Sequence, residues 1–261
     1  MKQIIRRGTN VQGAVSTTED MVTPSGKKGL FIEGRAKRFY HTGIPDLLIQ
    51  EFMDDSPSLN GKRRVKIKDK GALNNEVSSL IFEYLNGYHV HSHFVKKLSA
   101  NEMLVRRLEI MPLEVVVRNV AAGRLCRSHG IKEGQELPHP IIEHYLKNSR
   151  LGYPLLNEFH ISALELATPE ELKSINRTAS KINAVLKSFF DRRKLKLVDF
   201  KLEFGRYNGQ ILVGGEISLD TCRFRDRDSN QIIGVKNRTG AGLEDLREGY
   251  LELRERLCEK S

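Results

Sequence analysis

The stretch of residues 195–226 constrains the fold most, because it reads as a long strand, a tight turn and a returning strand. Apolar residues at every second position face one side of such a strand. These residues are Val198, Phe200, Leu202 and Phe204. The opposite side carries Asp199, Lys201 and Glu203. One face can therefore pack on a core while the other presents charged groups in a row.

An Asn-Gly pair follows this strand at 208–209, and both residue types tolerate the positive φ of a two-residue hairpin turn. Folding on that turn predicts that Lys201 lies opposite Glu216 and that Asp199 lies opposite Ser218. The acids gathered in this way need a cation or hydrogen bonds to offset their repulsion. A metal ion with a phosphate-bearing ligand is one such cation. A solvated strand face with a Lys–Glu cross-strand pair is the alternative interpretation.

The net charge of the chain indicates which classes of ligand it can bind. The 261 residues carry a net charge of +10, so the protein should attract anions. A nucleic-acid binder and an enzyme for phosphorylated small molecules both fit this charge. The basic run at 61–70 has no aromatic side chains on which bases could stack, so we expect no nucleic-acid partner. No apolar run approaches the ~20 residues that span a bilayer, so we expect no membrane partner.

Neither cysteine nor histidine spacing predicts a metal centre. An odd number of cysteines without a CxxC pair favours a reducing cytosol over a disulfide framework or a zinc ribbon. The three cysteines are Cys126, Cys222 and Cys258. His89, His91 and His93 would share one face of a strand, but no carboxylate stands nearby in the sequence. We therefore interpret them as histidines on a partly exposed strand.

The order of predicted elements is that of an α+β protein rather than an alternating βαβ one. Strands dominate the first part of the chain, and long helices flank the hairpin later. We expect a helix over 75–86, a connector at 107–112, a loop-rich stretch at 138–156 and a last helix over 242–257. Thr168, Pro169 and Glu171 form a capping box that begins a long helix ending near Asp191.

These elements predict an N-terminal extension over residues 1–28, a small β-rich domain over 29–110 and a larger α+β domain over 111–261. The chain has no Walker phosphate loop and no dinucleotide GxGxxG. A lysine on an N-terminal sheet, here Lys37, together with carboxylates on a later strand is the layout that nucleoside-triphosphate chemistry needs. Arg118 stands at a strand end before small residues, which suits anion binding, and a tight packing turn is the alternative.

Five segments resemble the phosphoribosylaminoimidazole-succinocarboxamide (SAICAR) synthase family of purine biosynthesis. They follow the family's order and are residues 34–40 (GRAKRFY), 70–75 (KGALNN), 114–123 (EVVVRNVAAG), 197–205 (LVDFKLEFG) and 217–223 (ISLDTCR). The resemblance implies a two-domain α+β fold related to protein kinases and ATP-grasp ligases. It has antiparallel sheets with flanking helices, and ATP lies between the domains.

The resemblance also implies ATP-dependent joining of L-aspartate to the carboxylate of carboxyaminoimidazole ribonucleotide, through an acyl phosphate. It implies ATP and Mg²⁺ as cofactors, a homodimer and a cytoplasmic enzyme. A kinase-like phosphotransferase on the same scaffold is the alternative activity. An acyl phosphate converts a poor leaving group into phosphate, so a closing glycine-marked hairpin that keeps water away is reasonable.

Site residues are carried over by position. The catalytic group is Lys37, Lys201 and Glu203. ATP is expected to contact Arg35, Lys37, Leu108, Ile110, Met111, Lys147 and Glu203. The ribonucleotide is expected to contact Arg118, Ser218, Asp220 and Arg223, and the metal is expected on Glu203 and Glu216.

Four positions depart from the family pattern. Arg35 stands where lysine is usual, and Arg124 stands where serine is usual, so Arg124 reaches either substrate phosphate or solvent. Leu219 replaces the proline of a Ser-Pro-Asp step. Gly215 replaces an aspartate, which removes an expected metal carboxylate. We predict that Glu216 or a water fills that role, since Mg²⁺ tolerates several water ligands.

Overall fold

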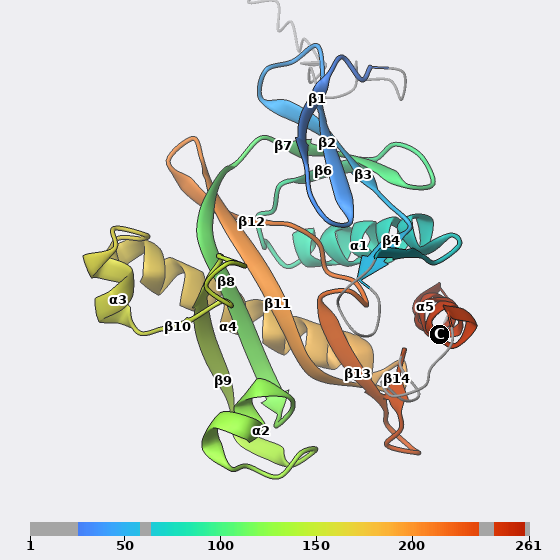
Figure 1. Cartoon of the computed structure of the whole chain (residues 1–261), viewed down its shortest axis with the longest axis vertical. Helices are drawn as coiled ribbons and strands as arrows, with labels where there is room; N and C mark the ends of the chain where they lie inside the picture. The colour runs from blue at the N-terminus through green and yellow to red at the C-terminus, as the bar shows by residue number, and fades with distance from the viewer. Residues whose placement is uncertain (1–25, 58–63, 235–242, 259–261) are drawn as a thin grey trace, which may run out of the picture.

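The computed structural model describes residues 26–57, 64–234 and 243–258 (Figure 1). Residues 1–25 of the expected N-terminal extension lie outside this part, as do residues 61–63 of the basic run. Within the described residues, no helix is both long enough and apolar enough to cross a membrane.

A small antiparallel sheet forms the upper part of the molecule in Figure 1. Its strand order is β1-β2-β3-β7-β6. The strands are β1 (Leu30–Glu33), β2 (Lys37–His41), β3 (Leu47–Phe52), β6 (Phe94–Lys97) and β7 (Glu102–Arg106). A separate two-stranded ribbon pairs β4 (Asp55–Pro57) with β5 (Arg64–Lys66).

A larger antiparallel sheet lies below it, in the order β10-β9-β8-β11-β13-β14, with β12 also paired to β11. The strands are β8 (Glu109–Val120), β9 (Glu136–Leu146), β10 (Leu155–Leu156), β11 (Leu195–Tyr207), β12 (Gln210–Gly214), β13 (Cys222–Asp226) and β14 (Ile232–Ile233). Strand β11 is central, with β8 on one side and β12 and β13 in succession on the other. The mixture of antiparallel sheets and separate helices confirms the α+β prediction.

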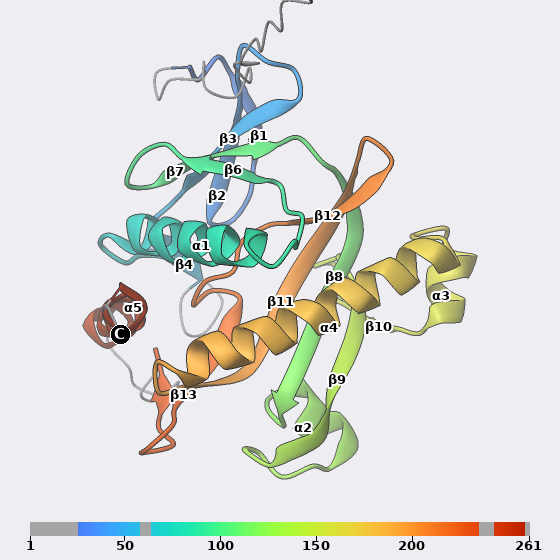
Figure 2. The same ribbon diagram turned by 180° about the vertical axis from the view of Figure 1, so that it is seen from behind.

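Five helices are described, and the longest covers one face of the large sheet. They are α1 (Lys70–Asn86), α2 (Arg124–His129), α3 (Glu158–Ala163), α4 (Pro169–Asp191) and α5 (Leu243–Cys258). Figure 2, the view from behind, shows α4 crossing in front of β11 and β8. Helix α1 lies under the small sheet, and α5 packs beside α1 (Figures 1 and 2).

The main core joins α4 to the large sheet. The predicted capping box is present, since Thr168 and Glu171 each accept a hydrogen bond from the other's backbone N–H. The apolar stripe of α4 packs against Phe200, Leu202 and Phe204 of β11. Helix α1 adds its buried face to the same cluster. Burial of this kind stabilises by roughly 25 cal/mol per Å² of apolar surface.

The predicted strand face is wrong at one position. Val198 is buried in a separate cluster with Val120 and Ala122, while Leu197 joins the main core. The pairing of β11 with β13 shifts between Leu197 and Asp199, and such a bulge changes which face a side chain meets.

The predicted hairpin register holds near the turn and fails beyond it. The Asn-Gly turn is present, and Glu203 pairs with Gly214. Gly215 then adopts φ +76°, which ends β12. Lys201 instead donates its backbone N–H to Thr221, and Asp199 pairs with Arg223 on β13. The predicted pairs of Lys201 with Glu216 and of Asp199 with Ser218 are therefore wrong, because β13 replaces β12 along this part of β11.

Helix α1 begins earlier than predicted. It starts at Lys70 because Gly71 packs directly on the end of β3, where a Cβ would meet the Phe52 carbonyl at 2.5 Å. The backbone N–H of Gly71 also donates to Asp54. Tertiary contacts therefore set this start, and no side chain caps it.

Three other local predictions are also wrong. Strand β8 already begins at Glu109, so only residues 107–108 connect the sheets. The stretch 138–156 contains β9, whose prolines are tolerated because β10 covers so little of its outer edge. Residues 89–93 form no strand, since His89 has φ 54° and only an isolated bridge at Ser92 occurs there.

Candidate active site

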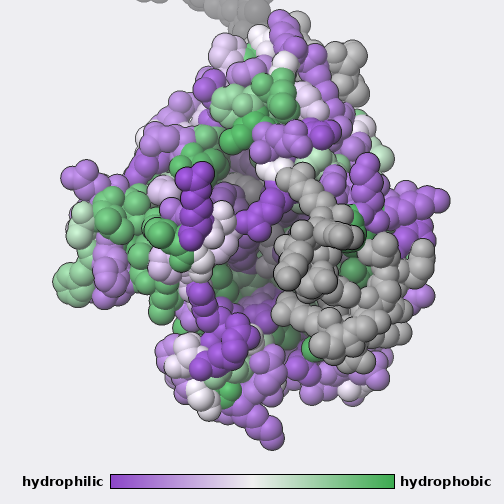
Figure 3. Space-filling view, viewed as in Figure 1, coloured by the Kyte–Doolittle hydropathy of each residue, from purple (hydrophilic) through white to green (hydrophobic). Residues whose placement is uncertain are grey.

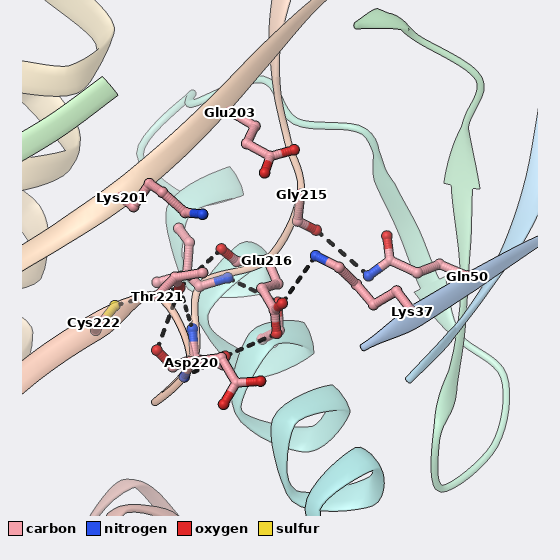
Figure 4. A network of polar contacts seen from close by, with 12 residues as sticks. Lys37, Gln50, Lys201, Glu203, Gly215, Glu216, Asp220, Thr221 and Cys222 are labelled. Carbon is pink, nitrogen blue, oxygen red and sulfur yellow. Dashed lines mark hydrogen bonds and ion pairs between the residues drawn. The ribbon is translucent and has the colours of Figure 1, made fainter. Parts of the chain in front are cut away.

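A lysine of the small sheet meets a carboxylate that follows the large-sheet hairpin. The Lys37 Nζ lies 2.9 Å from Glu216 Oε1, and both side chains are mostly buried (Figure 4). Burial alone would lower the pKa of Lys37, but Glu216 and Glu203 outweigh it and the pKa is raised. Burial would raise the pKa of Glu216, yet Lys37 holds it below its usual value. Both groups therefore stay charged.

Glu203 lies beside this pair on β11 (Figure 4). Its Oε2 accepts a hydrogen bond from Lys147 Nζ at 2.6 Å. Burial opposes ionisation of Glu203, but Lys37 and Lys147 lower its pKa to about 2. The neighbouring Lys201 pairs with Glu114 at 2.9 Å. The structure thus brings Lys37, Lys147 and Glu203 into one charged cluster.

The turn after β12 holds the remaining acids in place. The Ser218 hydroxyl donates to Glu216 Oε2 at 2.9 Å and accepts the backbone N–H of Asp220 at 3.1 Å. Thr221 donates its hydroxyl to the Glu216 carbonyl. Figure 4 shows Glu216, Asp220 and Thr221 below Glu203. Residues 216–221 therefore form a compact turn in which each polar side chain has a partner.

Lys70 and Tyr250 were missed as site residues. Lys70 is 1% exposed, and its Nζ donates to Asp220 Oδ2 at 2.5 Å. The Tyr250 hydroxyl donates to Asp220 Oδ1 at 2.5 Å. Lys70 opens the family-like segment at 70–75, which was a usable signal. Tyr250 lies in the predicted last helix, where nothing in the local sequence marked it as a site residue.

A second charged cluster lies further along β11. Arg118 is 5% exposed and donates to Glu143 Oε2 at 2.5 Å and to Asp199 Oδ2 at 2.7 Å. Arg223 binds both oxygens of Asp199, with Nε to Oδ1 at 2.7 Å. Burial would lower the pKa of Arg118, but Glu143 and the nearby Tyr145 hydroxyl raise it. The sequence missed Glu143 because its strand was expected to be a loop.

Arg118 and Arg223 therefore share Asp199, and they differ in access. Arg118 is enclosed by protein partners, whereas the Arg223 side chain is 33% exposed. Of the two, Arg223 is the better placed to meet an anionic group of a ligand.

Arg35 and Arg124 both contact Tyr153, in the loop after β9. Arg124 donates to the carbonyls of Tyr153 and Gly152, at 2.7 Å and 3.1 Å. Arg35, in the hairpin between β1 and β2, donates to the Tyr153 hydroxyl at 2.5 Å. We predicted that Arg124 reaches either substrate phosphate or solvent. The structure shows a third role, because Arg124 holds a loop in which Tyr153 has φ 55°.

The segment that joins the sheets packs against the hairpin through Leu108. A Cβ at Gly205 would meet the Leu108 Cβ at 2.7 Å, and one at Gly214 would meet Leu108 Cδ1 at 3.2 Å. Two glycines therefore let this segment lie directly on β11 and β12. Ile110 is 47% exposed, whereas Met111 is buried in the main core.

His93 and Gln50 line the small-sheet side of the cluster. Both are buried, and within the part of the chain that the structure describes His93 Nε2 and Gln50 Oε1 have no hydrogen-bond partner. Burial lowers the pKa of His93 to about 3, with Lys37 adding to the effect, so the ring is neutral. Among the described residues, no set of three or more histidines, cysteines or acids is placed to hold a metal.

The remaining donor set fits a magnesium ion that arrives with phosphate. Glu203 and Glu216 supply two carboxylates, and Gly215 supplies none. Mg²⁺ commonly takes one or two protein carboxylates and completes its shell with water and substrate phosphates. Figure 3 shows the face above the large sheet hollowed, with hydrophilic side chains along the rim.

A lysine of one sheet that faces a carboxylate on the other sheet and one just after its hairpin is the arrangement of an enzyme that acts on a nucleoside triphosphate. A family model described as SAICAR synthetase matches residues 30–255. The chain therefore belongs to the SAICAR synthetase family, and it is an ATP-dependent C–N ligase of purine biosynthesis.

Two relatives are similar in sequence to this chain over nearly their whole length. The phosphoribosylaminoimidazole-succinocarboxamide synthase of Chloroherpeton thalassium is 50% identical over 88% of this chain and 98% of its own. That of Chlorobium limicola is 50% identical over 90% and 99%.

Solved structures show the same fold. The synthase of Ehrlichia chaffeensis superposes with a TM-score of 0.82 at 38% identity, covering 87% of this chain and 98% of its own. A SAICAR synthetase in complex with ADP superposes with a TM-score of 0.81 at 39% identity, covering 88% and 98%.

Proposed function

We propose that the enzyme joins L-aspartate to the carboxylate of carboxyaminoimidazole ribonucleotide, forming SAICAR, ADP and phosphate. The observation that carries this proposal is the contact between Lys37 and Glu216, with Glu203 beside it. It places an ammonium of one sheet and carboxylates of the other at a single point. A triphosphate with its cation needs both kinds of group.

The charged cluster suggests how ATP is used. Lys37 pairs with Glu216, and Lys147 pairs with Glu203. Each ammonium group can exchange its carboxylate for a phosphate oxygen of ATP. Leu108 stands where the chain crosses between the sheets, Ile110 and Met111 lie at the start of β8, and we propose that the backbone of these residues meets adenine. Arg35 reaches the same cleft from the β1–β2 hairpin. Bound Mg²⁺ supplies charge neutralisation for the transferring phosphoryl group, and Glu203 and Glu216 are the residues proposed to hold it.

The acyl phosphate is the proposed intermediate. The ribonucleotide carboxylate takes the γ-phosphoryl group, and the aspartate amine then displaces phosphate. Lys201, beside Glu203, is proposed to stabilise the negative charge of these oxygens. Arg223, Arg118, Ser218 and Asp220 are proposed to hold the ribonucleotide, with Arg223 the most exposed of the two arginines.

Further proposals rest on the family resemblance. We propose that the two sheets define domains at 29–110 and 111–261, that ATP lies between them, and that the enzyme is a cytoplasmic homodimer. The three cysteines are unpaired, which fits a reducing compartment.

The decisive test is an assay that omits one component at a time from ribonucleotide, ATP, Mg²⁺ and L-aspartate. We expect the succinocarboxamide only in the complete mixture. Steady ADP release without aspartate, with a phosphorylated product, would instead establish the phosphotransferase.

A lysine variant tests the role of Lys37. Lys37→Met should lower kcat/KM by roughly a hundredfold or more, because a charge aimed at the transferring phosphoryl group is lost. Lys97→Met is the control, since Lys97 is an exposed lysine of the same sheet. Equal activity of the two variants would refute the nucleotide role of Lys37.

A further inference from the structure

Helix α5 stands outside both sheets, yet its Tyr250 reaches the proposed substrate site. The residue is 8% exposed, and its ring packs with Ile67 and Leu73. Its hydroxyl donates to Asp220 Oδ1 at 2.5 Å. Proximity to Asp220 and burial raise the pKa of Tyr250, burial being the larger cause, so the hydroxyl keeps its proton. A helix distant in sequence thus supplies a donor to a site carboxylate.

The Asp220 carboxylate is held at both oxygens. Lys70 Nζ donates to Oδ2 at 2.5 Å and also to the Asp55 carbonyl at 3.2 Å. An ionised carboxylate offers about four lone-pair positions, so one on each oxygen remains for a ligand. Two donors on different oxygens fix the plane of the group. Without Tyr250, a single contact to Lys70 leaves that plane free to rotate.

Asp220 is also connected to the nucleotide lysine. Its backbone N–H donates to Ser218 Oγ, and the Ser218 hydroxyl donates to Glu216 Oε2. Glu216 in turn pairs with Lys37. These bonds hold the turn without Tyr250, whose hydroxyl contacts only the Asp220 carboxylate within this turn (Figure 4).

We infer that Tyr250 is a positioning residue of the ligase, whose hydroxyl orients Asp220 for the ribonucleotide and so makes α5 part of the substrate site. This inference rests on the proposed function, in which Asp220 contacts that substrate. The ring of Tyr250 has a separate packing role, and the two roles can be separated because Tyr250→Phe keeps the ring and removes only the hydroxyl.

The experiment compares Tyr250→Phe with Arg254→Gln. Arg254 pairs with Glu76 at 3.2 Å, so its substitution loosens the contact of α5 with α1 without touching Asp220. Tyr250→Phe should raise the KM for the ribonucleotide about tenfold, because a hydrogen bond to a charged group is lost. Its KM for ATP should stay within about twofold, and Arg254→Gln should change neither value.

A double variant adds a second readout. In the Asp220→Asn background, Tyr250→Phe should change the logarithm of the ribonucleotide KM by less than about a third of the change that it causes in the wild-type background. The reason is that the effects of residues that act through one another are not additive. Calorimetric titration of the ribonucleotide into each variant measures the same affinity without turnover.

The outcomes are distinct. An unchanged ribonucleotide KM in Tyr250→Phe, or equal rises for every substrate in both single variants, would overturn the positioning role. Full additivity with Asp220→Asn would also overturn it. Absence of succinocarboxamide from the wild-type enzyme would instead refute the proposed function.

Discussion

The site has two charged regions that neutralise their carboxylates differently. In the lysine region, single ammonium groups pair with carboxylates near the cleft. Its members are Lys37, Lys147, Glu203 and Glu216. In the arginine region, guanidinium groups share buried carboxylates through several bonds. Its members are Arg118, Arg223, Asp199 and Glu143.

The difference matches what each region has to do. An ammonium is a compact charge on a flexible stem, so it can leave a carboxylate for a phosphate oxygen. A guanidinium is a rigid fork that holds a carboxylate in fixed geometry. The lysine region is thus suited to exchange partners when ATP and its cation bind, and the arginine region is suited to keep its shape.

The largest expected effect is in the arginine region. Arg118→Met leaves Glu143 and Asp199 without a shared partner, and a broken buried ion pair costs about 3–5 kcal/mol. Urea unfolding should therefore show a loss of that size. Arg227→Met is the control, because Arg227 forms an exposed pair with Asp191 and such pairs contribute about 0–1 kcal/mol. A loss below about 1 kcal/mol in Arg118→Met would show that the region is not rigid.

The next effect is the acid sensitivity of the lysine region. The pKa of Glu203 is depressed from 4.5 to about 2, so its stabilising contribution is present above 4.5 and is lost as pH falls towards 2. A shift of this size corresponds to at most about 3 kcal/mol. Glu203→Gln should flatten the fall in unfolding free energy between pH 4.5 and 2. An unchanged slope would mean that Glu203 is not held ionised by Lys37 and Lys147.

The missing carboxylate at Gly215 offers a third test. Gly215→Asp should lower the unfolding free energy by about 1–2 kcal/mol, because a side chain is strained at φ +76°. It should also lower the Mg²⁺ concentration for half-maximal activity several-fold, since it adds an acid where a Cβ lies 3.4 Å from Glu203.

Gly209→Asp is the matched control for this variant. Gly209 has φ +74° and open space around its Cβ position, so it carries the same strain away from the site. If both variants show the same Mg²⁺ dependence as the wild type, an additional carboxylate is not what the lysine region lacks.

How much the sequence predicted depends on how local each feature is. The Asn-Gly turn, the capping box of α4 and the core face at Phe200, Leu202 and Phe204 follow from neighbouring residues, and all are present. The register beyond Gly214 was wrong because β13, which comes later in the chain, takes that edge of β11. Local pattern cannot decide between two competing strands.

The site was predicted to a similar degree. Lys37 and Glu203 stand in family-like segments, and the structure places both in one charged cluster with Lys147, while their roles stay predictions. Lys70 and Tyr250 reach Asp220 from 150 and 30 positions away, through burial that only the packed fold creates. Glu143 was lost with the misassigned strand β9. Long-range partners of a charged residue are thus the part that needs the structure.

The smallest expected effect lies where the two sheets touch at the cleft rim. Tyr153→Phe removes the acceptor for Arg35 and keeps the ring, so the β1–β2 hairpin loses its bond to the loop after β9. An exposed hydrogen bond contributes about 0.5–1 kcal/mol, which predicts a rise of about threefold in the KM for ATP. Amide exchange in residues 33–37 should quicken, while exchange in β11 stays unchanged. Tyr88→Phe is the control, because that hydroxyl is exposed and forms a hydrogen bond with Tyr84 of α1. Unaltered exchange in the hairpin would show that this bond does not position the β1–β2 hairpin.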